Sequence, residues 1–146
     1  QRTAYILLAA NTAVFALWRI PRLQPFMTRH FTHHPYSGRS YTLVTSAFSH
    51  ASLMHFAFNM MGIYYFVGPV VNAMTPETFP AFYVSAAAAA SFLHHAGTLL
   101  LVNPATVLPA LGASGVLYSI LAIFCNLFPH AQLQIVFLPF WQFEAG

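Results

Sequence analysis

Four apolar runs divide the chain, and each is long enough for most of a helix that crosses a lipid bilayer. They cover residues 4–18, 51–71, 79–93 and 114–128. A spanning helix needs about 20 mostly apolar residues. Outside a closed barrel, only a helix satisfies its own backbone hydrogen bonds in hydrocarbon. The runs therefore predict an all-α membrane protein with several passes, folded as a single domain over residues 1–146.

The scarcity of charge excludes other classes of protein. The chain of 146 residues has 5 Lys+Arg and 2 Asp+Glu, and 58% of its residues are hydrophobic. A soluble domain averages roughly 25% charged residues, so this chain cannot solvate a globular surface. A nucleic-acid binder needs a dense basic face, which is absent here. We expect the lipid bilayer as a partner and no nucleic acid.

The connection over residues 19–41 carries most of the charge. It contains four arginines and no acid: Arg19, Arg22, Arg29 and Arg39. Arginine in short connections favours the matrix or cytoplasmic side of a membrane. We expect this connection to face the matrix or the cytoplasm.

Both ends of the chain resemble cuts in a longer polypeptide. The chain opens on Gln1 and is apolar by Tyr5, and it closes on Gly146 without a polar tail. Residues 133–141 are apolar but too short to span, which predicts a loop in the membrane interface or the start of an unfinished fifth span. We therefore expect a domain truncated at both ends.

Three polar residues interrupt the second apolar run: Ser52, His55 and Asn59. His55 and Asn59 are four positions apart, so they lie one turn apart on the same helix face, where both can donate to one acceptor. Ionisable and amide side chains inside an apolar span are costly and indicate a functional site. His50 precedes His55 by five positions and is rotated by about 140°, so we expect it near the mouth of the helix.

A second motif opens the fourth run. Ser114 lies between Gly112 and Gly115, at the predicted start of a helix. Unpaired N–H groups and the helix dipole favour negative charge there, which would stabilise an alkoxide or an oxyanion. The glycines permit a tight entry and close approach of a substrate backbone.

Each motif has simpler explanations. A histidine in a membrane helix often makes an interhelical hydrogen bond, and glycine and serine are common at helix starts. A haem or metal site is a more specific alternative, and its candidate ligands are His50, His55, His94, His95 and His130. Such a site needs histidines at matched depths on different helices, and His94 and His95 match poorly. We expect no metal and no cofactor.

In combination, His50, His55 and Asn59 with the Gly-x-Ser-Gly motif resemble the rhomboid family of intramembrane serine proteases. The resemblance implies a six-helix bundle, of which this chain holds about the first four helices. It also implies that Ser114 is the nucleophile and that His55 and Asn59 stabilise the oxyanion. His50 is implied to be structural or to organise water.

Three further segments resemble the mitochondrial, presenilin-associated branch of that family. These are residues 17–21, 46–50 and 137–140. The branch implies a multi-pass protein of the mitochondrial inner membrane that cleaves transmembrane helices of membrane-anchored substrates.

The chain departs from the family pattern at the general base. Rhomboids use a Ser–His dyad whose histidine lies in the sixth helix, and no histidine here matches that position. The resemblance implies that a missing C-terminal part or a second polypeptide supplies it, and that residues 1–146 alone are inactive. The alternative is a non-proteolytic rhomboid-like module that binds transmembrane helices.

Overall fold

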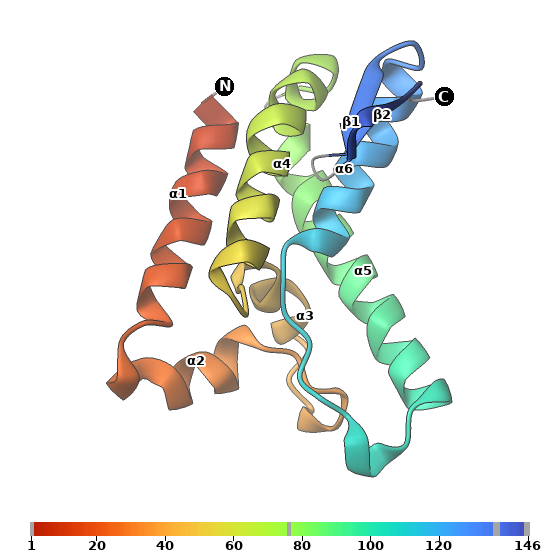
Figure 1. The fold of residues 1–146 in the computed structure, drawn as a ribbon. Helices are drawn as coiled ribbons and strands as arrows, with labels where there is room; N and C mark the ends of the chain where they lie inside the picture. The colour runs from red at the N-terminus through yellow and green to blue at the C-terminus, as the bar shows by residue number, and fades with distance from the viewer. Residues whose placement is uncertain (1, 76, 136–137, 145–146) are drawn as a thin grey trace.

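The computed structural model describes residues 2–75, 77–135 and 138–144. Four long helices form a bundle in it (Figure 1). They are α1 (Arg2–Leu17), α4 (Leu53–Ala73), α5 (Thr78–Leu101) and α6 (Ser114–Leu127). Each predicted apolar run forms one of these helices, so the predicted helical bundle is confirmed.

Helix α4 packs against α1 and α6, and α5 packs against α6. Buried aliphatic side chains such as Ile63, Val67 and Ile120 fill the space between these helices. Between apolar helices in lipid, close packing rather than transfer from water supplies the attraction, and small residues allow it. At Gly62, an added Cβ would lie 2.5 Å from a methyl carbon of Leu117 on α6. This glycine therefore sets how closely α4 and α6 approach.

Helix α5 is longer than the sequence predicts. The predicted run ends at residue 93, but the helix continues to Leu101 through His94, His95 and Gly97. The prediction ended where the apolar run ended, whereas the backbone continues because leucine and alanine favour the helix on both sides of these residues. The predicted end of this run at residue 93 is therefore wrong, and the 3-10 turn η4 (Pro104–Thr106) follows the helix.

Helix length and hydropathy identify α5 as the one helix, among the described residues, that is suited by itself to cross a membrane. Helix α1 and the helical segment Pro21–Phe31 that follows it meet at a bend of 96°, and together they would make a second candidate if they formed one broken span. Helix α6 is apolar but has only 14 residues. At 1.5 Å per residue it falls short of the roughly 30 Å hydrocarbon core.

The connection between α1 and α4 folds into short helical pieces at one end of the bundle (Figure 1). They are η1 (Pro21–Leu23), α2 (Gln24–Phe31), η2 (Pro35–Ser37), α3 (Thr42–Thr45) and η3 (Ser46–Phe48). Ser52 then caps α4, because its hydroxyl oxygen accepts from the N–H of His55 at 3.1 Å. This cap satisfies one of the free amides at the helix start.

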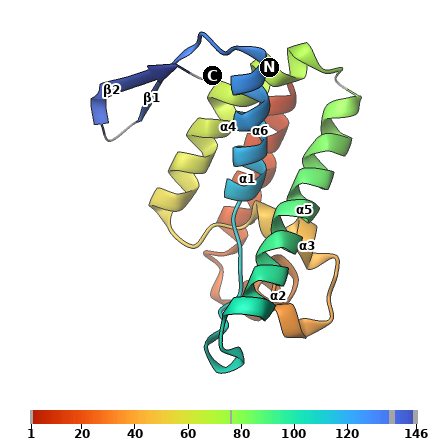
Figure 2. The same ribbon diagram turned by 90° about the vertical axis from the view of Figure 1, so that its right-hand side faces the viewer.

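The C-terminal part of the described chain corrects one expectation. Residues 133–135 and 138–141 form strands rather than a loop or the start of a helix. They belong to an antiparallel pair, β1 (Gln132–Ile135) and β2 (Leu138–Glu144), which extends away from the helices in Figure 2. The alternation of Gln and Leu or Ile along β1 has the two-residue period of a strand, and Pro139 disfavours a helix.

Candidate active site

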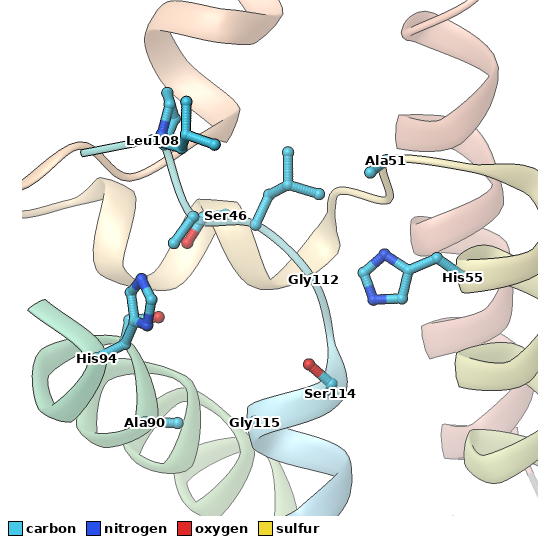
Figure 3. Close-up of a pocket in the computed structure, with 13 residues that line it drawn as sticks. Ser46, Ala51, His55, Ala90, His94, Leu108, Gly112, Ser114 and Gly115 are labelled. Carbon is cyan, nitrogen blue, oxygen red and sulfur yellow. The ribbon is translucent and has the colours of Figure 1, made fainter. Parts of the chain in front are cut away.

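A cavity of about 550 Å³ opens where the starts of α4 and α6 approach the side of α5. Figure 3 shows the side chains that surround it. Four predicted site residues line it: His55, Gly112, Ser114 and Gly115. The remaining lining residues are Ser46, Ala51, Ala90, Ser91, His94, Leu108, Pro109, Ala110 and Leu111. The fold thus brings together the two motifs that the sequence analysis singled out.

Ser114 is the first residue of α6, as predicted. Its hydroxyl has no hydrogen-bond partner among the described residues, and Ala113 before it provides no side-chain cap. The free N–H groups of the first turn therefore lie next to this hydroxyl. The position favours a developing negative charge.

Gly112 shapes the space beside Ser114. Its φ of 130° lies in a region that residues with a side chain rarely adopt. A Cβ on Gly112 would lie 2.7 Å from Cε1 of His55 and 3.0 Å from its Nε2. The same point is 3.7 Å from the Ser114 hydroxyl. The glycine therefore keeps open a small space that the imidazole and the hydroxyl both border.

His55 enters this space from α4. Figure 3 shows its imidazole pointing toward the segment that carries Gly112 and Ser114. The Cε1–Nε2 edge of the ring faces Gly112. Nε2 can therefore present a donor or an acceptor to a group bound beside Ser114.

Gly115 has a packing role. A Cβ there would lie 2.6 Å from the Cβ of Ala90 on α5. Small residues at this crossing allow α5 and α6 to approach closely. Any larger residue at Gly115 would push the start of α6, and Ser114 with it, away from α5.

Asn59 lies on the same side of α4 as His55 but does not line the cavity. Its side-chain amide donates to the carbonyl of His55 at 2.7 Å, and only 4% of the residue is exposed. Its Oδ1 is buried and has no hydrogen-bond partner. In this conformation Asn59 supports the backbone of the turn that carries His55, and its amide does not reach the space beside Ser114.

His50 lies before α4 rather than within it, so the rotation argument from helical periodicity does not apply. Only 3% of it is exposed, so it is buried rather than at an open mouth. Its ring meets the ring of His55 edge to face, with centroids 5.2 Å apart. It also lines a smaller cavity of about 210 Å³ with Trp18 and Arg19.

The surroundings of His50 favour its neutral form. Burial lowers the pKa of His50 to about 4, and repulsion from His55 adds to the effect. The backbone of Phe48 opposes the shift, although neither ring nitrogen reaches full hydrogen-bond geometry with a described residue. A neutral His50 adds no positive charge beside the His55 ring.

The far wall of the cavity was not predicted from the sequence. Ser46, Ser91 and His94 supply polar side chains there. The amide of Gly112 donates to the carbonyl of Ser46 at 2.9 Å, which attaches the segment before Ser114 to η3. Ser46 lies in a segment that resembles the mitochondrial branch, but the sequence did not predict this contact, because it uses a backbone carbonyl that any residue has.

The histidines weighed as metal ligands do not converge. In residues 2–75, 77–135 and 138–144, no three His, Cys, Asp or Glu side chains come close enough together to hold a metal ion. His94 faces the cavity, whereas His95 turns toward the α2–α3 connection.

Comparison with known families agrees with this arrangement. The model of the rhomboid domain matches residues 37–143, a range that contains the cavity and both motifs. The chain belongs to the rhomboid family. The resemblance drawn from His55, Asn59 and the Gly-x-Ser-Gly motif is thereby confirmed.

Similar proteins carry mitochondrial names. The chain is 41% identical over 147 residues to the human presenilin-associated rhomboid-like protein, mitochondrial. The matched region covers 100% of this chain and 38% of that protein. It is 33% identical over 140 residues to rhomboid protein 1, mitochondrial, of Saccharomyces cerevisiae, over 95% of this chain and 40% of that protein. The chain thus spans less than half the length of these relatives.

Proposed function

We propose that this chain provides the nucleophile and the oxyanion-binding part of an intramembrane serine protease, with Ser114 as the nucleophile. One observation carries the proposal. The Ser114 hydroxyl and the His55 imidazole border the same open space beside Gly112, inside a cavity of about 550 Å³. A nucleophile and an oxyanion donor must both lie about 3 Å from the reacting group.

The chemistry follows from these positions. The Ser114 oxygen attacks a peptide carbonyl carbon, and a general base takes the hydroxyl proton. The carbonyl oxygen becomes an oxyanion, which His55 and the N–H of Ser114 stabilise. The base then gives its proton to the leaving amine as the C–N bond breaks, and water hydrolyses the acyl-enzyme.

The general base is not among the residues placed beside Ser114. The Ser114 hydroxyl has no hydrogen-bond partner in the described part of the chain, and His55 is assigned to the oxyanion. We place the base on a histidine outside residues 1–146, in a further part of the polypeptide or on a second one. The relatives' greater length supports this assignment.

Asn59 is the second proposed oxyanion donor. Its amide donates to the His55 carbonyl, so it must turn from that carbonyl to reach an oxyanion. We expect its contribution to be smaller than that of His55.

The substrate proposed for the cavity is a membrane-anchored protein whose transmembrane helix unwinds locally. A helical peptide bond is shielded by its own hydrogen bonds, so unwinding must precede attack. The names of the relatives support a mitochondrial location, and we propose a multi-pass protein of the inner membrane.

Cleavage by the complete membrane protein tests the nucleophile. Ser114→Ala should lower cleavage of a transmembrane reporter by at least about 10³-fold, while the protein still binds it. Ser119→Ala is the matched control, because this serine lies on the same helix and donates to the Gly115 carbonyl at 3.1 Å. Wild-type cleavage by Ser114→Ala would overturn the assignment. Binding without cleavage by the unmodified protein would favour the non-proteolytic module.

A further inference from the structure

His33 connects three elements around the cavity. It lies between α2 and η2 and is only 4% exposed. Its backbone forms an isolated antiparallel bridge with Ala110, in which each N–H donates to the other residue's carbonyl at 2.8 Å. Ala110 belongs to residues 108–112, which line the cavity and lead into Ser114. We call residues 108–112 the cavity wall.

The side chain of His33 has a fixed pattern of hydrogen bonds. The hydroxyl of Thr42 donates to the carbonyl of Arg39 at 2.6 Å, so its oxygen can only accept from His33 Nδ1, which lies 2.8 Å away. A neutral His33 then carries its proton on Nδ1 and presents Nε2 as an acceptor. His95 Nδ1 lies 2.9 Å from that Nε2 and must donate to it.

The hydrogen bond between His33 and His95 persists when the pair gains one proton, but not when it gains two. His95 is half-buried on α5. When it gains a proton on its other nitrogen, its Nδ1–H still donates to His33. A second proton can enter only at His33 Nε2. The N–H groups of His33 Nε2 and His95 Nδ1 then face each other across the 2.9 Å between the two nitrogens, and two positive charges lie side by side.

The groups that face His33 all oppose its protonation. They are His94 and His95 on α5 and His34 on its own connection. Thr42 on α3 is neutral, and the cavity wall contains no titratable side chain. Burial lowers the pKa of His33, and the three histidines lower it further. The hydrogen bond between His33 and His95 should therefore persist at neutral pH and break when the pH falls below the ordinary pKa range of histidine.

We infer that His33 is a positioning residue, which joins the cavity wall to α5 through His95 and releases it when both imidazoles are protonated. The structural part of this inference is independent of proteolysis. Its effect on cleavage rests on the proposed function, because the wall leads directly into Gly112 and Ser114.

Hydrogen exchange at the wall tests the inference on the complete protein in lipid nanodiscs. Protection of the Ala110 amide, corrected for the intrinsic pH dependence of exchange, should fall by about tenfold between pH 7.5 and pH 5. His95→Gln keeps a donor toward His33 and does not titrate, so protection should stay high at both pH values. His95→Leu removes the donor, so protection should already be low at pH 7.5.

His94→Gln is the control, because His94 neighbours His95 but makes no hydrogen bond to His33. It should keep the protection at pH 7.5 and still lose it on acidification, at a slightly higher pH because one histidine that opposes protonation of His33 is removed. Equal pH dependence in the wild type and in His95→Gln, or full protection in His95→Leu, would overturn the inference. Reporter cleavage on the same samples separates the two proposals. If the protection of the Ala110 amide changes as expected but the reporter is not cleaved, this inference stands and the proposed function fails. If the reporter is cleaved but the protection depends neither on pH nor on His95, this inference is refuted.

Discussion

The Nε2 of His55 lies 3.0 Å from the point that a Cβ on Gly112 would occupy. This distance is shorter than a normal contact between a carbon atom and a ring nitrogen. The imidazole therefore occupies space that only glycine leaves free, and the two residues depend on each other although 57 positions of sequence separate them.

Gly112→Ala should consequently impair both the site and the fold. The new Cβ would displace the His55 ring, and the φ of 130° would strain the backbone by about 1–3 kcal/mol. Reporter cleavage and thermal unfolding of the complete protein measure the two effects. Gly68→Ala is the control, because a Cβ there meets nothing within 4 Å. Equal behaviour of the two variants would contradict the role of Gly112.

His55→Ala should lower turnover by about 10²-fold to 10³-fold and change substrate affinity little, because an oxyanion donor acts mainly in the transition state. Steady-state cleavage with separate kcat and KM values checks this. A rise in KM at unchanged kcat would assign His55 to substrate binding instead.

Asn59→Ala should lower turnover less than His55→Ala does. It should also destabilise the fold by about 1 kcal/mol, because the amide hydrogen bond to the His55 carbonyl is lost. Kinetics and thermal unfolding of the same preparation separate the two effects. Should Asn59→Ala reduce turnover as much as His55→Ala without loss of stability, its amide reaches the oxyanion directly.

Stability should decrease as the pH falls from 6.5 toward 4, because of His50. Burial lowers the pKa of His50 to about 4, whereas the unfolded chain takes up the proton near the ordinary histidine pKa of 6.5. The unfolded state therefore binds more protons in this window, and the loss reaches at most about 3 kcal/mol at its acid end. Unfolding midpoints against pH for the wild type and His50→Gln test this. A slope that persists in full in His50→Gln would exclude His50 as its source.

The connection between α1 and α4 should face the matrix, because its four arginines have no acidic counterpart. Ser40→Cys in a Cys125→Ser background gives an exposed thiol there. A membrane-impermeant thiol reagent should label it only after detergent opens mitoplasts. Labelling of intact mitoplasts would place the connection on the other side.

The sequence by itself determined the helices and the family. Apolar runs predict helices because a backbone in hydrocarbon must satisfy its own hydrogen bonds. The His55–Asn59 spacing and the Gly-x-Ser-Gly motif are local patterns, so they can be recognised without a fold. Prediction from local pattern was wrong at the end of α5, where a continuing helix looked like a connection. It was also wrong at the β1–β2 hairpin, where short strands looked like a loop or the start of a helix.

Only the tertiary structure decided which of these residues meet. His55 and Ser114 belong to different helices, and the packing of α4, α5 and α6 places them around one cavity. The same packing buries the Asn59 side chain, and it buries His50 beside His55. It also pairs His33 with His95, which are 62 positions apart. Such contacts depend on helix crossings and backbone hydrogen bonds between distant segments, and no periodicity along the chain encodes them.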